Sequence, residues 1–322
     1  MAEAERKQLT HDDYSVAIIC PLEVEMSAMR YMLDEEHYEL PAKAGDPNGY
    51  IYGQMLGHNL VIGYLPEGSQ GVGTAATVAT HMKRTFPQAK LRLLVGIGGG
   101  VPSERGDVRL GDVVVALPQG TNGGVVQYDL GKATITGFER KGFLQPPPDE
   151  WRNAVVKMQS DHRVKDYQIS TFVDKMIQQS PRLEVYRRPS LEKDVLFLPT
   201  NKHVTGTLAC GQCDKSQVVP RHPPTRDAPR IFYGLVASGN QVLKDAVLRD
   251  ELARDAGGAL CFEMEAAGLM NNFRCVVIRG ISDYADSHKN DEWHPYGAAV
   301  AAGCAKELLS YFKPTIRKYS IV

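Results

Sequence analysis

Residues 260–285 read LCFEMEAAGLMNNFRCVVIRGISDYA, and this stretch decides the fold that we expect of the chain. A helix is predicted to open at Glu263–Glu265, followed by an apolar strand over Cys275–Gly280 that leads to Asp283. Acids at the ends of apolar segments usually have a partner or a task, because carboxylates are costly to bury. Open α/β sheets bind ligands at the carboxyl ends of their strands, where Asp283 lies. Alternatively, the two glutamates only begin a helix and Asp283 caps the next one.

Two motifs in this stretch resemble those of a known superfamily. Glu-Met-Glu-Ala-Ala, beginning at Glu263, and Arg-Gly-Ile-Ser-Asp, ending at Asp283, resemble the purine nucleoside phosphorylases and nucleosidases. The resemblance is strongest to the methylthioadenosine/S-adenosylhomocysteine nucleosidase branch and covers roughly residues 14–115 and 231–309. Pro-Leu-Glu-x-Glu and Ala-Ser-Gly-Asn-Gln-Val look like fungal stand-alone or effector-domain versions. The resemblance implies an α/β fold with three α/β/α layers around a mixed, partly barrel-like sheet.

Composition indicates an ordinary globular protein and argues against two kinds of partner. Hydrophobic residues make up 43% of the 322 residues and charged residues 23%. The formal net charge of −1 provides no basic field for nucleic acid or an anionic membrane. We find no signal peptide and no apolar run of about eighteen residues, so we expect no membrane segment.

The six cysteines indicate a reducing compartment. Cys20, Cys261 and Cys275 fall in or beside strand-like runs, where buried thiols are common. This pattern favours a cytoplasmic protein over a disulfide framework, and it leaves secretion by another route open.

A segment near the start of the chain supplies a further acid. Tyr14–Cys20 is predicted as a buried strand from its β-branched residues, Pro21 ends it, and a helix opens near Leu22. Glu25 then lies in the first turn of that helix, where an acid often only complements the helix dipole. In the nucleosidases this strand–turn–Glu-x-Glu pattern carries the carboxylate that activates water. The resemblance gives that role to Glu25.

Two glycine-rich segments are predicted to border the ligand. Gly71–Ala76 opens a helix, but no acid ends the next strand, which disfavours a dinucleotide-binding fingerprint. The start of this helix, with Gly73, remains a site for sugar hydroxyls or an anion. Gly96–Pro102 is predicted as a loop whose backbone approaches a flat ligand. The resemblance places Gly98 and Gly99 beside the base and the ribose.

The segment from about 142 to 230 is less regular and looks like an insertion in a single domain spanning residues 1–322. We expect it to form a lid or an oligomer contact. Cys210-Gly-Gln-Cys213, with His203 and His222 nearby, suggests half of a zinc site. One CxxC without a second pair is weak evidence, and a surface loop is the alternative, so we predict no metal.

The resemblance assigns five more residues to substrate binding. Glu265 is expected to bind the ribose 2′ and 3′ hydroxyls, and Met264 the face of the sugar. Val242 and Leu243 take the positions that contact the base, although the nucleosidases have an aromatic stacking residue where this chain has Val242. Ser282 belongs to the Ile-Ser-Asp motif.

These residue types suit cleavage of a ribosyl–purine bond. Asp283, kept protonated by burial, would donate a proton to N7 of the purine, and Glu25 would deprotonate water. The charge of Glu265 would favour an oxocarbenium-like sugar. Phosphate as the nucleophile needs fixed positive charge, usually arginine. The phosphorylases that the chain resembles carry one arginine in the first loop and one two residues ahead of the strand-end glycine. Here the first loop, residues 20–25, has no arginine, and the second position is Leu94. Hydrolysis is therefore the expected reaction.

We therefore predict a purine nucleosidase of nucleoside metabolism and purine salvage that acts on adenosine, inosine or guanosine, without a metal or redox cofactor. The expected partner is a small purine nucleoside, and a homo-oligomer of two or more copies is expected from the family. The alternatives are a phosphate-dependent phosphorylase and a nucleoside-sensing module without catalysis. A nucleotide nucleosidase would need cations near the 5′ position, where Lys289 is a candidate in a loop with His288, Trp293 and His294.

Overall fold

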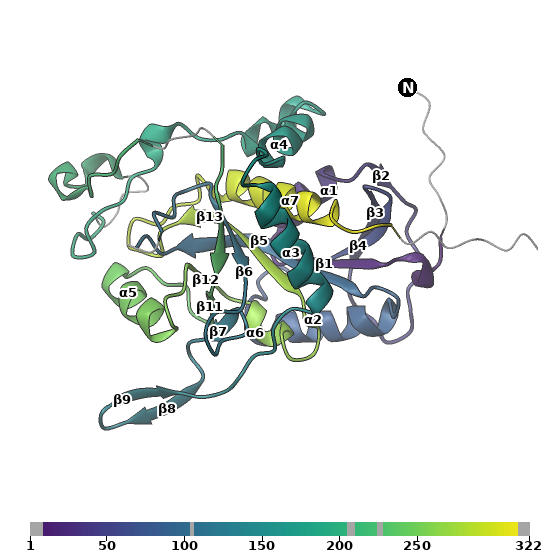
Figure 1. Ribbon diagram of the computed structural model, residues 1–322, viewed down its shortest axis with the longest axis horizontal. Coiled ribbons are helices and arrows are strands. Elements are labelled where there is room, and N and C mark those ends of the chain that lie inside the picture. Colours follow the sequence, from purple (N-terminus) through teal and green to yellow (C-terminus); the bar gives the residue numbers. More distant parts are fainter. Residues whose placement is uncertain (1–8, 104–105, 205–209, 224–227, 315–322) are drawn as a thin grey trace, which may run out of the picture.

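A mixed sheet of eleven strands runs through the middle of the molecule, with helices on both faces (Figure 1). The structure is a computed structural model that describes residues 9–103, 106–204, 210–223 and 228–314. The three α/β/α layers confirm the fold class predicted from the sequence. The strands of the sheet are β1 (Val16–Cys20), β2 (Glu35–Glu36), β3 (Tyr50–Met55), β4 (His58–Tyr64), β5 (Leu91–Gly100), β6 (Val113–Ala116), β7 (Val125–Gln127), β10 (Ile231–Gly234), β11 (Val236–Ser238), β12 (Cys261–Glu263) and β13 (Val276–Asp283).

The centre of the sheet consists of apolar strands that are buried on both faces. Along its main path the strand order is β10-β6-β13-β5-β1-β4-β3-β2, and β5 runs parallel to both β1 and β13. Every residue of β1 and β13 is buried, as expected for parallel strands covered by helices. Their carboxyl ends therefore lie at the same edge of the sheet.

A side branch makes the sheet partly barrel-like. The end of β5 turns away from β1, and Gly99 and Gly100 pair antiparallel with β12. Strand β12 continues the branch through β11 to β7. The sequence had predicted a loop over Gly96–Pro102, and that prediction is wrong, because the strand continues through Gly100.

Helices from distant parts of the chain cover the two faces (Figure 1). Helix α7 packs on β13 and β5, and α1 and α4 pack on α7, whereas α2 packs on β4 and α6 on the opposite face. All but two residues of α7 are buried, which its alternation of small and apolar residues allows. The helices are α1 (Glu23–Tyr31), α2 (Val72–Thr85), α3 (Asp149–Asp161), α4 (Ile169–Ile177), α5 (Ala246–Asp255), α6 (Ala266–Leu269) and α7 (His294–Leu309).

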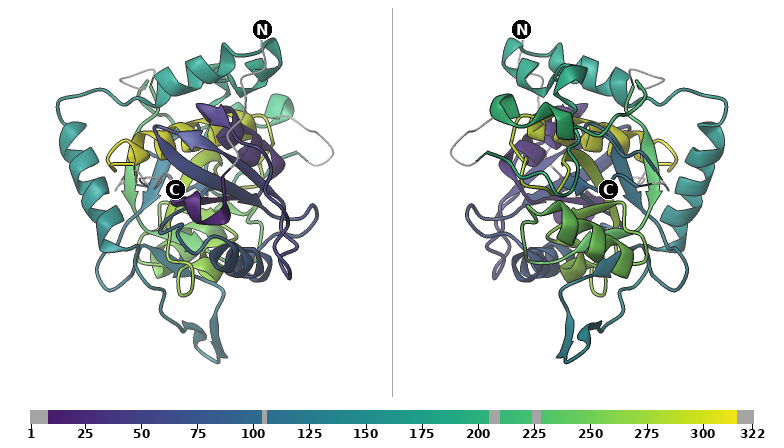
Figure 2. Two further views of the ribbon diagram at one scale, coloured as in Figure 1. Left: turned by 90° about the vertical axis from the view of Figure 1, so that its right-hand side faces the viewer. Right: turned by 90° about the vertical axis from the view of Figure 1, so that its left-hand side faces the viewer.

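In the part of the region from 142 to 230 that the structure describes lie α3, α4 and four short 3-10 helices, and α4 packs against α7. Just before it, the hairpin of β8 (Gly131–Thr134) and β9 (Gly137–Arg140) projects from the body of the molecule, as Figure 2 shows. The assignment of this region as an insertion in one domain remains a prediction. Among the described residues, no helix is long and apolar enough to cross a membrane.

Strand β13 and helix α7 approach each other through two glycines. A Cβ atom added to Gly280 would lie 1.8 Å from the carbonyl oxygen of Gly297. We predict that Gly280→Ala lowers the free energy of unfolding by about 1–3 kcal/mol, because helix or strand must shift. Chemical denaturation measures this change. Gly73→Ala is the control, since a Cβ atom there meets nothing within 4 Å and alanine favours the helix. Equal stability of both variants would contradict the close approach.

Candidate active site

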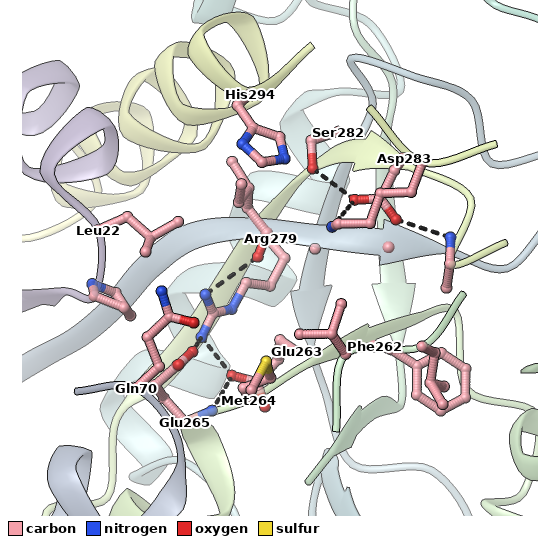
Figure 3. Close-up of a pocket in the computed structure, with 18 of the residues that line it drawn as sticks. Leu22, Gln70, Phe262, Glu263, Met264, Glu265, Arg279, Ser282, Asp283 and His294 are labelled. Atoms are coloured by element: carbon pink, nitrogen blue, oxygen red, sulfur yellow. Dashed lines mark hydrogen bonds and ion pairs between the residues drawn. The ribbon is translucent and has the colours of Figure 1, made fainter. Parts of the chain in front are cut away.

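A cavity of about 200 Å³ opens at the carboxyl ends of β1, β5 and β13 (Figure 3). Four acids that are far apart in the sequence line it: Glu25, Glu263, Glu265 and Asp283. Glu25 comes from the first turn of α1, Asp283 ends β13, Glu263 ends β12, and Glu265 immediately precedes α6. The fold therefore gathers the predicted acids at the edge of the sheet where α/β proteins bind ligands.

Arg279 of β13 lies among three of these acids: it pairs with Glu263 and Glu265 (Figure 3) and lies near Glu25. Its guanidinium is 1% exposed, and its Nη2 pairs with Glu263 and lies 3.3 Å from Oε2 of Glu265. Its Nη1 lies 3.9 Å from Oε1 of Glu25. Buried carboxylates need a cation or hydrogen-bond donors close by, and Arg279 provides a cation that does not lose its charge.

The glycines of β5 make room for this cluster. A Cβ atom at Gly96 would lie 2.3 Å from Oε1 of Glu25 and 2.5 Å from Nη1 of Arg279. A Cβ atom at Gly99 would lie 2.8 Å from Oδ1 of Asp283. The glycine run is therefore explained by the acids and the arginine that pack against it, in addition to any ligand.

The position and the pKa of the Glu25 carboxyl group suit a general base. Its Oε2 accepts from the Leu22 N–H at 2.7 Å and its Oε1 from the Ile97 N–H at 2.7 Å. Burial raises the pKa of Glu25 to about 7, against the opposing effect of the Arg279 guanidinium. A carboxyl group with a pKa near neutrality exchanges protons readily under physiological conditions.

Glu265 lies just outside the helix in which the sequence placed it. Strand β12 ends at Glu263, and α6 begins only at Ala266, so the predicted helix start at Glu263 is wrong. The reason is that the Glu263 carboxylate accepts from the backbone N–H groups of Glu265 and Ala266. Burial also raises the pKa of Glu265, and its Oε1 accepts from the Gly71 N–H at 3.4 Å.

Asp283 is buried but not isolated. Its Oδ2 accepts from Lys289 Nζ at 2.6 Å and from Ser282 Oγ at 3.1 Å, and its Oδ1 accepts from the Ala285 N–H at 2.8 Å. A register shift between Ile281 and Asp283 in β13 sets its direction. The sequence-based expectation considered burial alone, whereas the structure places the Lys289 ammonium in contact with the Asp283 carboxylate.

Comparison with known proteins extends these observations. No protein-family model matches the sequence. The chain is 42% identical over 314 residues to a nucleotide-binding leucine-rich repeat (NLR)-like protein from Hyaloscypha variabilis, which covers 97% of this chain. The chain spans only 31% of the length of that relative. It is also 23% identical over 305 residues to a 5'-methylthioadenosine/S-adenosylhomocysteine nucleosidase from Mycobacterium bovis, covering 92% of this chain and 95% of the relative.

Solved structures show the same fold. The nucleosidase of the same name from Neisseria meningitidis, in complex with methylthio-immucillin-A, superimposes with a TM-score of 0.58 at 17% identity, covering 92% of this chain and 99% of the other. Futalosine hydrolase from Helicobacter pylori gives a TM-score of 0.57 at 16% identity, with 94% and 100% coverage. The chain therefore has the fold of these nucleosidase and hydrolase structures.

Most residues that the superfamily resemblance singled out line the same cavity. Leu243 is buried in its wall, whereas Val242 is 52% exposed at its rim. Gly73 is exposed in the first turn of α2 and does not line the cavity, and the preceding Gln70 does. The predicted residues along the cavity are Glu25, Gly98, Gly99, Val242, Leu243, Met264, Glu265, Ser282 and Asp283.

Several lining residues were not predicted from the sequence as part of the site. Arg279 is the most important, and an arginine in the apolar run VVIRGI was a signal that a buried acid must face it. Gln70, Gln241 and Phe262 carried no such signal. Lys289 and His294, expected near the ribose 5′ side, do line the cavity, but Lys289 contacts Asp283.

We predict that Arg279→Met lowers the free energy of unfolding by about 3–5 kcal/mol near neutral pH, because buried carboxylates lose their cation. The loss should shrink as the pH falls. Glu25 and Glu265 have folded-state pKa values above their unfolded values, so folding takes up protons and stability is lost as the pH rises through about 7. Denaturation at several pH values measures both effects.

Arg92→Met is the matched control for this prediction. Arg92 is partly buried and donates to the carbonyl oxygens of Ala89 and Phe273, not to a carboxylate. Arg92→Met should lower the free energy of unfolding by less than Arg279→Met does, and the decrease should not shrink as the pH falls. If Arg279→Met lowered the free energy of unfolding by the same amount at every pH, the arginine would not be what stabilises the three ionised glutamates.

Proposed function

We propose that the chain is a purine nucleosidase that hydrolyses the N-glycosidic bond of a purine ribonucleoside to free base and ribose. The observation that carries the proposal is the convergence of Glu25, Glu265 and Asp283 on one buried cavity. The superfamily and the named activities of the similar nucleosidases support it.

The proposed step needs a base, an acid and a site for positive charge. Glu25 takes a proton from water as the water oxygen bonds to C1′ of the ribose. The electrons of the C1′–N9 bond pass to the purine, and N7 receives a proton from Asp283. Glu25 suits the first role because its pKa is about 7 and its two backbone donors fix its position.

The arrangement around Asp283 supports a role in proton transfer with a partner. Lys289, in the loop that follows β13, places its Nζ 2.6 Å from the Asp283 carboxylate. A purine that reaches the Asp283 carboxylate must share or displace this contact with Lys289. Lys289 is thus paired with Asp283 in the free protein, and a 5′ phosphate, the ligand that the sequence suggested for it, would compete with this carboxylate.

The acidic excess of the cavity supports stabilisation of a cationic sugar. Four carboxyl groups line the cavity, against the cationic side chains of Arg279 and Lys289. Glu265, held by Arg279 and the Gly71 N–H, presents its carboxylate at the position proposed for the ribose hydroxyls. Fixed negative charge beside an oxocarbenium-like transition state lowers the barrier, because it needs no reorganisation.

The same charges favour water over phosphate. Among the described residues that line the cavity, Arg279 and Lys289 are both ion-paired with carboxylates. A phosphate would meet acids that repel it and cations that are already engaged. Hydrolysis is therefore the better supported reaction within the superfamily.

A second candidate is a nucleoside-sensing module without turnover. The observation that favours it is the 42% identity to part of an NLR-like protein, of which the chain spans 31%. In such a module the same cavity would bind a nucleoside and release no product. The assay that follows separates the two functions.

The test is a panel of adenosine, inosine, guanosine and methylthioadenosine, with and without phosphate, followed by chromatography of the free base. We expect release of base without phosphate. Asp283→Asn should lower kcat by about 10²–10⁴-fold with nucleoside binding kept, because the proton donor is lost. Asp245→Asn, a change at the N-cap of α5 outside the cavity, is the control and should keep full activity.

Three outcomes would count against the nucleosidase. Base release that strictly requires phosphate would make the chain a phosphorylase. Saturable binding of a nucleoside without any product would support the sensing module. Unchanged turnover in Asp283→Asn would remove Asp283 from its role.

We also predict that kcat/KM rises with pH through a midpoint of about 7. The sign follows from the role of Glu25: only its carboxylate form accepts a proton from water, and protonation at lower pH removes the base. Rates of base release measured from about pH 5 to about pH 9 define the midpoint. Glu25→Gln should abolish turnover throughout. A rate that increases as the pH falls below 7 would contradict Glu25 as the base.

A further inference from the structure

A cluster of sulfur and nitrogen ligands lies beside the loop that follows Asp283. The Sγ atom of Cys213 lies 3.3 Å from Nδ1 of His203, and Sγ of Cys210 lies 3.7 Å from the same nitrogen. His288 comes from the other side of the cluster, and one of its ring nitrogens lies within 4.8 Å of both Cys213 Sγ and a ring nitrogen of His203. His203, Cys213 and His288 thus meet in one place, and Cys210 approaches the group through His203.

The imidazole of His288 is buried there without a hydrogen-bond partner in the part of the chain that the structure describes. The residue is 8% exposed, and neither ring nitrogen has a hydrogen-bond partner among the described residues. The nearest carboxylate oxygen, of Asp286, lies 3.8 Å from Nδ1, which is too long for a hydrogen bond. The ring is held by Phe197, which stacks on it at 4.0 Å. A buried ring nitrogen without a partner is costly, and a metal ion would satisfy it.

We propose that His203, Cys210, Cys213 and His288 bind one Zn²⁺ ion. Two thiolates and two imidazoles form a Cys2His2 set of the kind that structural zinc prefers. Zinc–ligand distances of about 2.0–2.3 Å in a tetrahedron place ligand atoms roughly 3.3–3.8 Å apart. The two distances from the thiols to His203 Nδ1 fall in this range. The second pair of ligands comes partly from a distant loop, which is why a single CxxC led us to predict no metal.

The ion would join the 142–230 region to the loop that borders the active site. These segments already meet through the His203 N–H, which donates to Ser287 Oγ at 3.0 Å, and through Arg221, which donates to Tyr284 OH at 2.8 Å. The same loop carries Lys289, which contacts Asp283. All four coordination positions are filled by protein, so the site has a structural role and leaves none for substrate.

Metal analysis of the full chain, purified under reducing conditions, tests the proposal without any activity assay. We expect about one zinc ion per chain by mass spectrometry of the metal. Cys213→Ser and His288→Asn should each lose most of it. Two control variants should keep it: Cys304→Ala, which removes a buried free cysteine of α7, and His222→Asn, which removes a histidine near the CxxC pair.

Reconstitution of the unaltered chain covers the case in which a variant fails to fold. Zinc is removed with a chelator in the presence of a thiol reductant, and Zn²⁺ or Co²⁺ is added back. We expect a higher melting temperature with Zn²⁺, and with Co²⁺ the visible bands of tetrahedral coordination with a sulfur charge-transfer band. A folded chain that binds neither ion, a Cys210–Cys213 disulfide in the purified chain, or zinc retained by both ligand variants would overturn the proposal. None of these readouts depends on nucleoside turnover.

Discussion

The contact between Arg279 and three buried glutamates is the constraint on which the rest of the site depends. Glu25, Glu263 and Glu265 come from two distant parts of the chain, and each would be costly to bury without a partner. Strand β13 brings the guanidinium to them, and Gly96 of β5 leaves the space that the cluster needs. One cation does not balance three carboxylates, and burial raises the pKa values of two of them, Glu25 and Glu265.

This imbalance links the architecture to the chemistry. A cavity that is short of positive charge is a poor site for phosphate and a good one for a transition state in which the sugar becomes cationic. The same shortage accompanies the raised pKa values of Glu25 and Glu265, for which burial is the largest cause.

The sequence predicted the fold and the acids because local patterns report them. Apolar β-branched runs mark β1 and β13, and the carboxylates that follow them lie at the edge where ligands bind. Arg279, Gln70 and Phe262 were missed because their place in the site depends on which strands become neighbours. The start of α6 was misplaced for a related reason, since the side chain of Glu263 binds the backbone that a helix would use.

The loop after β13 connects the irregular 142–230 region to the central sheet. Asp283 ends a buried strand, and within six residues the chain provides both His288, in the sulfur and nitrogen cluster, and Lys289, on the Asp283 carboxylate. Adjacent residues thus face two sites, so a shift of the backbone that disturbs the cluster also moves the ammonium that pairs with Asp283. His203 and Arg221 contact this loop from the 142–230 region, so that region is connected to the cavity through the loop and not through any acid that lines it.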